Sequence, residues 1–185
     1  MSYYLKNCRT GEDAVYETKV DITEKDGVVR FTFTAHNSQG FCRGSKHNDY
    51  HCMGDACEVL IGSDPERKWY YEIEVSPVGK LLVAKMGYMG ANEWGDPELD
   101  IHFVSEEDNF VKSGAEKIED GYVAWVEFEK KDIMVGEGEV YFNAYRLDTD
   151  GGEIHEKHLF ALYPTLCSKF HVPKCYQILK DYANK

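Results

Sequence analysis

The chain of 185 residues is 43% hydrophobic and 14% aromatic, which is enough for one domain whose core needs no disulfide or metal ion. Its formal charge is −12, from 21 basic and 33 acidic residues, so its surface repels nucleic-acid backbones and anionic membranes. This balance suits a neutral ligand or a cation. Because the sequence has no Pro/Gly/Ser-rich linker and no internal repeat, we expect a single domain over residues 1–185.

The N-terminal segment lacks the basic start and apolar run of a signal peptide, and no later segment is apolar for long enough to span a bilayer. We therefore expect a cytoplasmic protein whose six cysteines are free thiols. A sequence truncated from a longer exported protein would instead permit secretion and disulfides.

Aromatic and β-branched runs along the chain predict an all-β fold. Residues 14–21 alternate as a first strand, and a turn at 24–27 leads into a second strand, so we expect a hairpin with a loop of several residues. Residues 38–54 are polar, without a period, and predict a long loop. This loop brings rings, a guanidinium and imidazoles near the next strand, in the residues Phe41, Arg43, His47, Tyr50 and His51. Such a loop either forms a polar ligand site or is solvated, with its aromatics packed under the sheet.

Residues 54–85 predict three neighbouring antiparallel strands at the centre of a sheet. Side chains alternate along a strand, so the middle strand has an apolar face made of Tyr71, Ile73 and Val75. Its other face is expected to be in contact with water and carries Tyr70, Glu72 and Glu74. Glu58, on the first of these strands, stands out because its neighbours Ala56 and Leu60 are small or apolar.

Residues 86–100 are rich in glycine and predict a loop that carries Tyr88 and Trp94. An aromatic ring on such a loop can lie flat against the C–H face of a sugar. The alternative is a ring that covers one end of a sandwich.

Later strands are predicted at residues 101–104, 121–130 and 140–148, with closing strands in 157–165 and 176–182. Trp125 lies in mid-strand and is expected in the core. Alternation places Asn143 and Tyr145 on one face and Arg146 on the other. A buried Arg or Asn here needs polar partners, which a hydroxylated ligand could supply.

Several motifs occur in a fixed order: GDACEVLIG, WYYEIEVSPVGKL, VYFNAYRLD, LYPT and FHVP. The order resembles the family 9 carbohydrate-binding modules. The matched positions are Asp55, Glu58 and Val59, then Tyr70 to Gly79, then Asn143, Tyr145 and Arg146, and finally Phe170, His171 and Pro173. The resemblance spans most of the chain.

The resemblance implies an all-β sandwich of two antiparallel sheets, of immunoglobulin-like or jelly-roll type, with long loops at one end. It also implies non-catalytic binding of a mono- or oligosaccharide, in a family associated with carbohydrate catabolism, some members of which bind structural calcium. Glu58 and Arg146 would hydrogen-bond sugar hydroxyls, Asn143 and Lys85 would assist, and the rings of Trp94 and Tyr163 would stack. The complete predicted sugar site is Glu58, Lys85, Trp94, Asn143, Arg146, Tyr163 and His51.

The sequence also permits other chemistry. Glu58 and Arg146 could instead form a buried ion pair that ties strands together. Soft ligands crowd one part of the chain without the paired spacing of zinc sites, namely Cys42, His47, His51, Cys52 and Cys57. Three acidic residues around a glycine turn are weak calcium candidates, namely Asp148, Asp150 and Glu153. We expect no resident cofactor.

An enzyme is a third possibility. Glu72 and Glu74 could act as a glycosidase pair, and Cys52 beside His51 suggests a thiol nucleophile, but nothing signals an oxyanion hole. We expect a non-catalytic domain. A sugar-binding module predicts one cleft that gathers Trp94, Tyr163, Glu58 and Arg146. A sandwich that has lost sugar binding and serves as an interaction or structural domain predicts these residues paired or covered, with an apolar patch elsewhere. Oligomeric state is left open.

Overall fold

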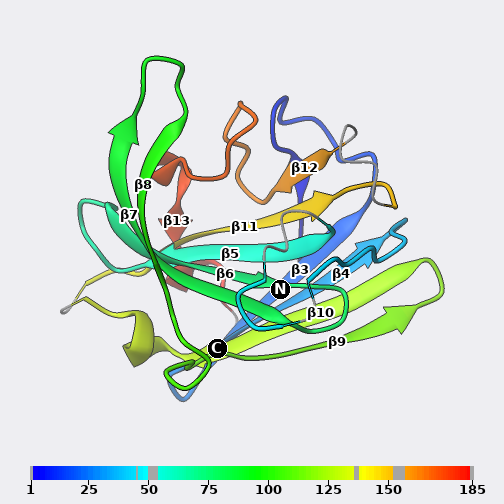
Figure 1. Ribbon diagram of the computed structural model, residues 1–185, viewed down its shortest axis with the longest axis horizontal. Helices are drawn as coiled ribbons and strands as arrows, with labels where there is room; N and C mark the ends of the chain where they lie inside the picture. Colours follow the sequence, from blue (N-terminus) through cyan, green and yellow to red (C-terminus); the bar gives the residue numbers. More distant parts are fainter. Residues whose placement is uncertain (1, 45, 50–53, 136–137, 152–156, 184–185) are drawn as a thin grey trace.

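Two antiparallel sheets face one another in the computed structural model, which describes residues 2–44, 46–49, 54–135, 138–151 and 157–183 (Figure 1). The smaller sheet has the order β1 (Ser2–Tyr4), β3 (Thr18–Lys25), β4 (Val28–His36), β10 (Gly121–Glu129) and β9 (Lys112–Ile118). The larger sheet has the order β2 (Lys6–Asn7), β12 (His158–Ala161), β11 (Tyr141–Asp148), β5 (Ala56–Gly62), β6 (Trp69–Val75), β7 (Leu81–Ala91) and β8 (Pro97–Phe103), and β13 (Gln177–Ile178) pairs with β11. The predicted all-β sandwich of two antiparallel sheets is confirmed.

Short 3-10 turns occupy η2 (Lys130–Ile133), η3 (Pro173–Cys175) and η4 (Leu179–Asp181). No helix in the described ranges is long and apolar enough to cross a membrane.

The main core lies between the two sheets, because each strand turns its apolar residues to the same side. Phe31 and Phe33 of β4 pack with Val59 and Ile61 of β5 and with Ile73 of β6, all fully buried. Each side chain of this size contributes about 1.5–3 kcal/mol on burial. The apolar face predicted for β6 is confirmed, because Ile73 and Val75 are buried in this core and Tyr71 packs against it.

The β3–β4 hairpin is tighter than the sequence predicted. Its loop is the pair Asp26 and Gly27, at φ 51° and 80°, between the paired residues Lys25 and Val28. Positive φ at both positions suits a two-residue turn, and Asp-Gly is a favoured sequence for it. The expected loop of several residues was wrong, and the strand begins at Thr18 instead of Ala14.

The glycine-rich stretch predicted as a loop is mostly a long hairpin. β7 continues to Ala91 and pairs with β8, with a register shift between Tyr88 and Gly90. Only residues 92–96 form the turn, where the Asn92 side-chain oxygen accepts hydrogen bonds from the backbone N–H groups of Trp94 and Asp96. The hairpin projects beyond the neighbouring strands (Figure 1).

Two features of the smaller sheet differ from the prediction. β9 was not predicted, because its sequence KSGAEKI shows no apolar alternation and it lies at the sheet edge. Trp125 is not in the core. Its ring lies on the outer face of the smaller sheet, with the Arg30 guanidinium 4.1 Å from the ring centroid and Gly114 directly beneath it.

The outer face of the larger sheet, which was expected to contact water, is covered by a later segment of the chain. Leu60, Tyr70 and Tyr145 belong to a second buried cluster on this face, together with Tyr176. Tyr145 stacks on Phe170 at 4.3 Å between ring centroids, and Tyr70 meets Tyr176 edge-on at 5.4 Å. Residues 164–176, which precede β13, therefore cover the outer face of the central strands. We call them the covering segment.

Candidate functional site

Three carboxylates lie on this covered outer face. Alternation places Glu58 of β5 and Glu72 and Glu74 of β6 on the same side, and Glu58 is the register partner of Glu74. Only 6% of Glu58 and 5% of Glu74 is exposed. Burial raises the pKa of Glu72 to about 7, and burial together with the neighbouring Glu72 raises the pKa of Glu74 well above its usual value. Glu72 and Glu74 thus influence one another's ionisation on this face.

His171 completes this cluster from the covering segment. Its Nδ1 lies 2.9 Å from Tyr70 Oη, and its Nε2 lies 3.6 Å from Glu72 Oε1. Burial lowers the pKa of His171 to about 4, so the ring is neutral at neutral pH. The ligand-capable atoms of Glu58, Glu72 and His171 all lie within 4.8 Å of one another.

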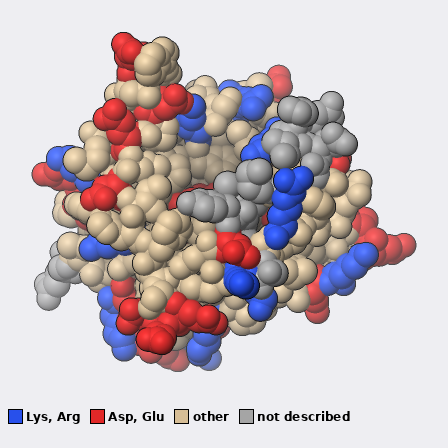
Figure 2. All heavy atoms as spheres, viewed as in Figure 1, with Lys and Arg blue, Asp and Glu red and all other residues tan. Residues whose placement is uncertain are grey.

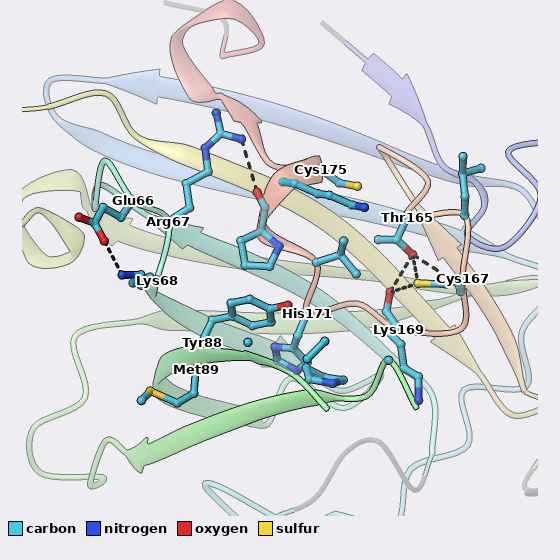
Figure 3. Close-up of a pocket in the computed structure, with 18 of the residues that line it drawn as sticks. Glu66, Arg67, Lys68, Tyr88, Met89, Thr165, Cys167, Lys169, His171 and Cys175 are labelled. Atoms are coloured by element: carbon cyan, nitrogen blue, oxygen red, sulfur yellow. Dashed lines mark hydrogen bonds and ion pairs between the residues drawn. The ribbon is translucent and has the colours of Figure 1, made fainter. Parts of the chain in front are cut away.

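A cleft of about 980 Å³ lies between the β7–β8 hairpin and residues 164–175. Figure 3 shows the Tyr88 and His171 rings facing this cleft, with Lys169 extending toward the hairpin. Met89, Ala91 and several prolines give the walls apolar surface. Acidic side chains gather on the projecting hairpin (Figure 2). The cleft thus offers both ring faces and charged groups to a ligand.

A second cavity of about 370 Å³ adjoins the cleft and reaches Glu58 and Glu72. Pro97, Lys169 and His171 line both spaces. The second cavity also has basic and apolar side chains in its lining, among them Arg9, Lys157, Leu159 and Phe170. The carboxylate cluster is therefore reached from the cleft past His171.

The loop that carries Lys169 is held in place on both sides. Lys169 forms an ion pair with Asp96 of the hairpin turn, which links the two walls of the cleft. Behind it, Thr165 Oγ1 donates to the Lys169 carbonyl at 2.7 Å and lies 3.1 Å from Cys8 Sγ. These contacts fix the cleft wall to the larger sheet.

The structure does not gather the predicted sugar site in one place. Glu58 lies on the outer face, but Arg146 lies on the inner face of β11, fully buried and paired with Asp148. Lys85 lies on the opposite face of β7 from the carboxylates, with its Nζ 5.4 Å from the centroid of the Trp69 ring. His51 lies outside the described residues.

The side chain of Asn143 forms hydrogen bonds with the backbone of Tyr163. The Asn143 amide donates to the Tyr163 carbonyl at 2.8 Å and accepts from the Tyr163 N–H at 3.0 Å. The Tyr163 ring packs edge-on against Tyr182 and does not line the cleft. Trp94 is 78% exposed at the hairpin tip, beside the cleft residues Ala91 and Gly95.

The metal candidates proposed from the sequence are dispersed. Asp148 is bound to Arg146, and Asp150 Oδ1 lies 3.2 Å from Tyr16 Oη. His47 Nε2 contacts the Val104 carbonyl, and Cys42 Sγ donates to the Gly44 carbonyl. Cys52, His51 and Glu153 lie outside the described residues. Within the described ranges, Glu58, Glu72 and His171 form the group of three that could hold a metal ion.

Sequence reasoning did not propose Lys169, His171 or Tyr70 as site residues. His171 carried a signal, since it stands in the FHVP motif, and Tyr88 had been singled out as a candidate ring. Lys169 shows no pattern in the sequence that marks it. Its place in the cleft depends on the path of the covering segment.

A two-sheet sandwich of this kind is found in carbohydrate-binding modules. No family model and no curated protein matches the chain. Among solved structures, a protein from Bacteroides uniformis ATCC 8492, provisionally described as carbohydrate-binding, matches with a TM-score of 0.73 at 14% identity, over 95% of this chain and 84% of that one. A family 9 carbohydrate-binding module from Caldicellulosiruptor kristjanssonii, in complex with glucose, matches with a TM-score of 0.55 at 9% identity, over 95% of this chain and 82% of that one.

Proposed function

We propose that the protein binds a mono- or oligosaccharide, without catalysis, in the cleft between the β7–β8 hairpin and residues 164–175. The observation that carries this proposal is the composition of that cleft, which places aromatic rings beside charged hydrogen-bonding groups in about 980 Å³. The fold supports it, because one structural neighbour is a module in complex with glucose.

Tyr88 and Trp94 supply the stacking surfaces in this proposal. A sugar ring has apolar C–H faces that match an aromatic face and a rim of hydroxyls that require hydrogen bonds. Tyr88 lines the cleft wall, and Trp94 is exposed on the turn beside it. Lys169 and His171 lie within reach of the rim, and Glu58 and Glu72 lie in the adjoining cavity.

Hydrolysis receives less support. The two carboxyl groups of a glycosidase flank the scissile bond, whereas neither Glu72 nor Glu74 lines the cleft.

A specific observation favours a second candidate, an interaction domain that has lost sugar binding. Arg146 is paired, Tyr163 is packed, and apolar side chains are exposed elsewhere, at Trp69, Ile101 and Phe103. Ile101 and Phe103 lie on the edge strand β8, on the outer face of the larger sheet, and Trp69 of β6 lies on the opposite face; none of the three lines the cleft. A protein partner at this edge is the alternative if no sugar binds.

Titration calorimetry against a panel of mono- and disaccharides tests the proposal. We expect Tyr88→Ala and Trp94→Ala each to weaken binding by at least ~1 kcal/mol, roughly fivefold, because each removes a stacking ring. Trp69→Ala is the matched control, since it removes an exposed tryptophan on the other face of the sheet. If the folded protein binds no sugar in the panel, the proposal is overturned. Equal losses of sugar affinity in Trp69→Ala and Trp94→Ala would also overturn it.

A further inference from the structure

The geometry points to a binding site for a divalent transition-metal ion, best matched by Zn²⁺, formed by Glu58, Glu72 and His171. The site lies at the junction of the cleft and the second cavity. The site shares His171, Glu58 and Glu72 with the surroundings of the proposed sugar site, but it can be tested without any sugar.

The three side chains come from separate elements and converge. β5 supplies Glu58, β6 supplies Glu72, and the covering segment supplies His171, with their ligand-capable atoms within 4.8 Å of one another. In a tetrahedral zinc site with bonds of 2.0–2.2 Å, ligand atoms stand about 3.4 Å apart. Side-chain rotations that move these atoms by about an ångström would close the site around an ion.

Tyr70 orients the His171 ring in the way that metal-binding histidines are oriented in proteins. Tyr70 is buried, and its Oη lies 2.9 Å from Nδ1. In the tautomer in which Nδ1–H donates to this oxygen, the Nε2 lone pair points toward Glu72 Oε1 at 3.6 Å. In that tautomer the Nε2 lone pair is available to a cation placed between it and the carboxylate; in the other tautomer Tyr70 Oη–H donates to Nδ1 and Nε2–H faces Oε1. A hydrogen bond to the second ring nitrogen is typical of histidines that bind metal.

Glu74, the neighbour of Glu72 on the same face of β6, adds an unused hydrogen-bond acceptor beside the three proposed ligands. Only 5% of Glu74 is exposed, and its Oε2 has no hydrogen-bond partner among the described residues. Leaving a buried oxygen unsatisfied costs about 1–3 kcal/mol in protein stability series. A cation held by Glu72 would compensate the charge of this whole group.

The donor set favours zinc over calcium. One imidazole nitrogen and two carboxylate oxygens make a three-ligand set with an open fourth position, as in many zinc sites. Calcium needs six to eight oxygen ligands, more than this cluster offers. The open position would face the cavity of about 370 Å³, where water or a ligand oxygen could complete the coordination.

Calorimetric titration of EDTA-stripped protein with ZnCl₂, in the absence of any sugar, tests this inference. We expect one ion per chain. His171→Gln and Glu72→Gln should each weaken binding by at least tenfold, and Tyr70→Phe, a positioning change, by about tenfold. His102→Gln is the matched control, because His102 is an exposed histidine on β8 paired with Asp100. Thermal melts of each variant establish that it is folded, and Zn²⁺ should raise the melting temperature of the parent protein but not of His171→Gln.

Three outcomes would overturn the site: no zinc binding by the parent protein, equal binding by His171→Gln and the parent, or preference for Ca²⁺ over Zn²⁺. Since no sugar is present, none of these results bears on the sugar-binding proposal. Equally, a failure of every sugar in the panel to bind has no effect on the result of the zinc titration.

Discussion

Arg146 and Asp148, two residues apart on β11, form an ion pair that is sealed between the sheets, with Nη2 and Oδ2 2.5 Å apart and side-chain exposures of 0% and 1%. The other terminal nitrogen of Arg146 donates to Thr18 Oγ1 at 2.8 Å and to the His36 carbonyl at 3.0 Å. The guanidinium therefore joins the larger sheet to β3 and β4 of the smaller one.

Removing the charge of Asp148 should strongly destabilise the protein. Asp148→Asn leaves a guanidinium buried without its anion, and breaking a buried pair in this way costs about 3–5 kcal/mol in free energy of unfolding. Urea denaturation measures the change. Glu129→Gln, in an exposed pair with Lys131, is the control and should leave stability unchanged within error. Similar losses of unfolding free energy in the two variants would show that the buried pair stabilises the protein no more than the exposed pair does.

Replacing Asn143 should also act on stability first. Asn143→Ala removes both hydrogen bonds to the Tyr163 backbone and one to Tyr145 Oη at 2.8 Å, so we expect a loss of about 2 kcal/mol. Denaturant melts measure this loss, and sugar titration of the folded variant provides the contrast. A large loss of sugar affinity with unchanged stability would contradict this structural role and support direct contact with the ligand.

Cys57 should resist modification, and the protein should lose stability through this thiol only as the pH rises above 9. Burial raises the pKa of its thiol to about 12, so at pH 8 the folded protein holds almost no thiolate there. The folded pKa lies above the unfolded value of 9.0, so this stabilisation is complete below pH 9 and is lost as the pH rises toward 12. Cys57→Val should therefore flatten the stability profile over that window. Iodoacetamide labelling at pH 8 with peptide mapping checks protection, and rapid labelling of Cys57 in folded protein would contradict it.

The Asp96–Lys169 ion pair should matter more for ligand binding than for stability. Both side chains are more than a third exposed, so Asp96→Asn should change the free energy of unfolding by no more than about 1 kcal/mol. Lys169→Ala also removes a cationic donor from the cleft, and we expect about a tenfold loss of sugar affinity. Calorimetry at low and high salt separates the two effects. A Lys169→Ala variant with full affinity would exclude this side chain from the site.

Sequence alternation predicted the inner faces of the central strands because their periodicity is local. Tyr71, Ile73 and Val75 could be assigned to the core without knowing what lies opposite. The outer face could not be assigned in this way. Glu72 and Glu74 alternate as exposed residues do, and their burial depends on a covering segment about a hundred residues later in the chain. No local pattern reports such a contact.

The candidate site was predictable to a similar extent. Glu58 was recognised from its apolar neighbours, and Trp94 from its place among glycines. Arg146 was expected to meet a ligand because a buried guanidinium needs acceptors. The protein itself supplies those acceptors, through Asp148 and backbone carbonyls of β4 and its surroundings. Trp125 was assigned to the core by its mid-strand position, whereas the cation of Arg30 covers its ring from outside.

The strand β5 is buried along all seven of its residues, with β11 and β6 hydrogen-bonded to its two edges and apolar clusters on both faces. Its amide protons can therefore reach solvent only when the sandwich opens as a whole. Their hydrogen-exchange rates should report the global free energy of unfolding, whereas amides of residues 92–96 at the hairpin turn should exchange through local fluctuations. The hairpin turn at one wall of the cleft can thus move on a fast timescale, whereas Glu58, in the adjoining cavity, belongs to the slowest-exchanging strand of the molecule.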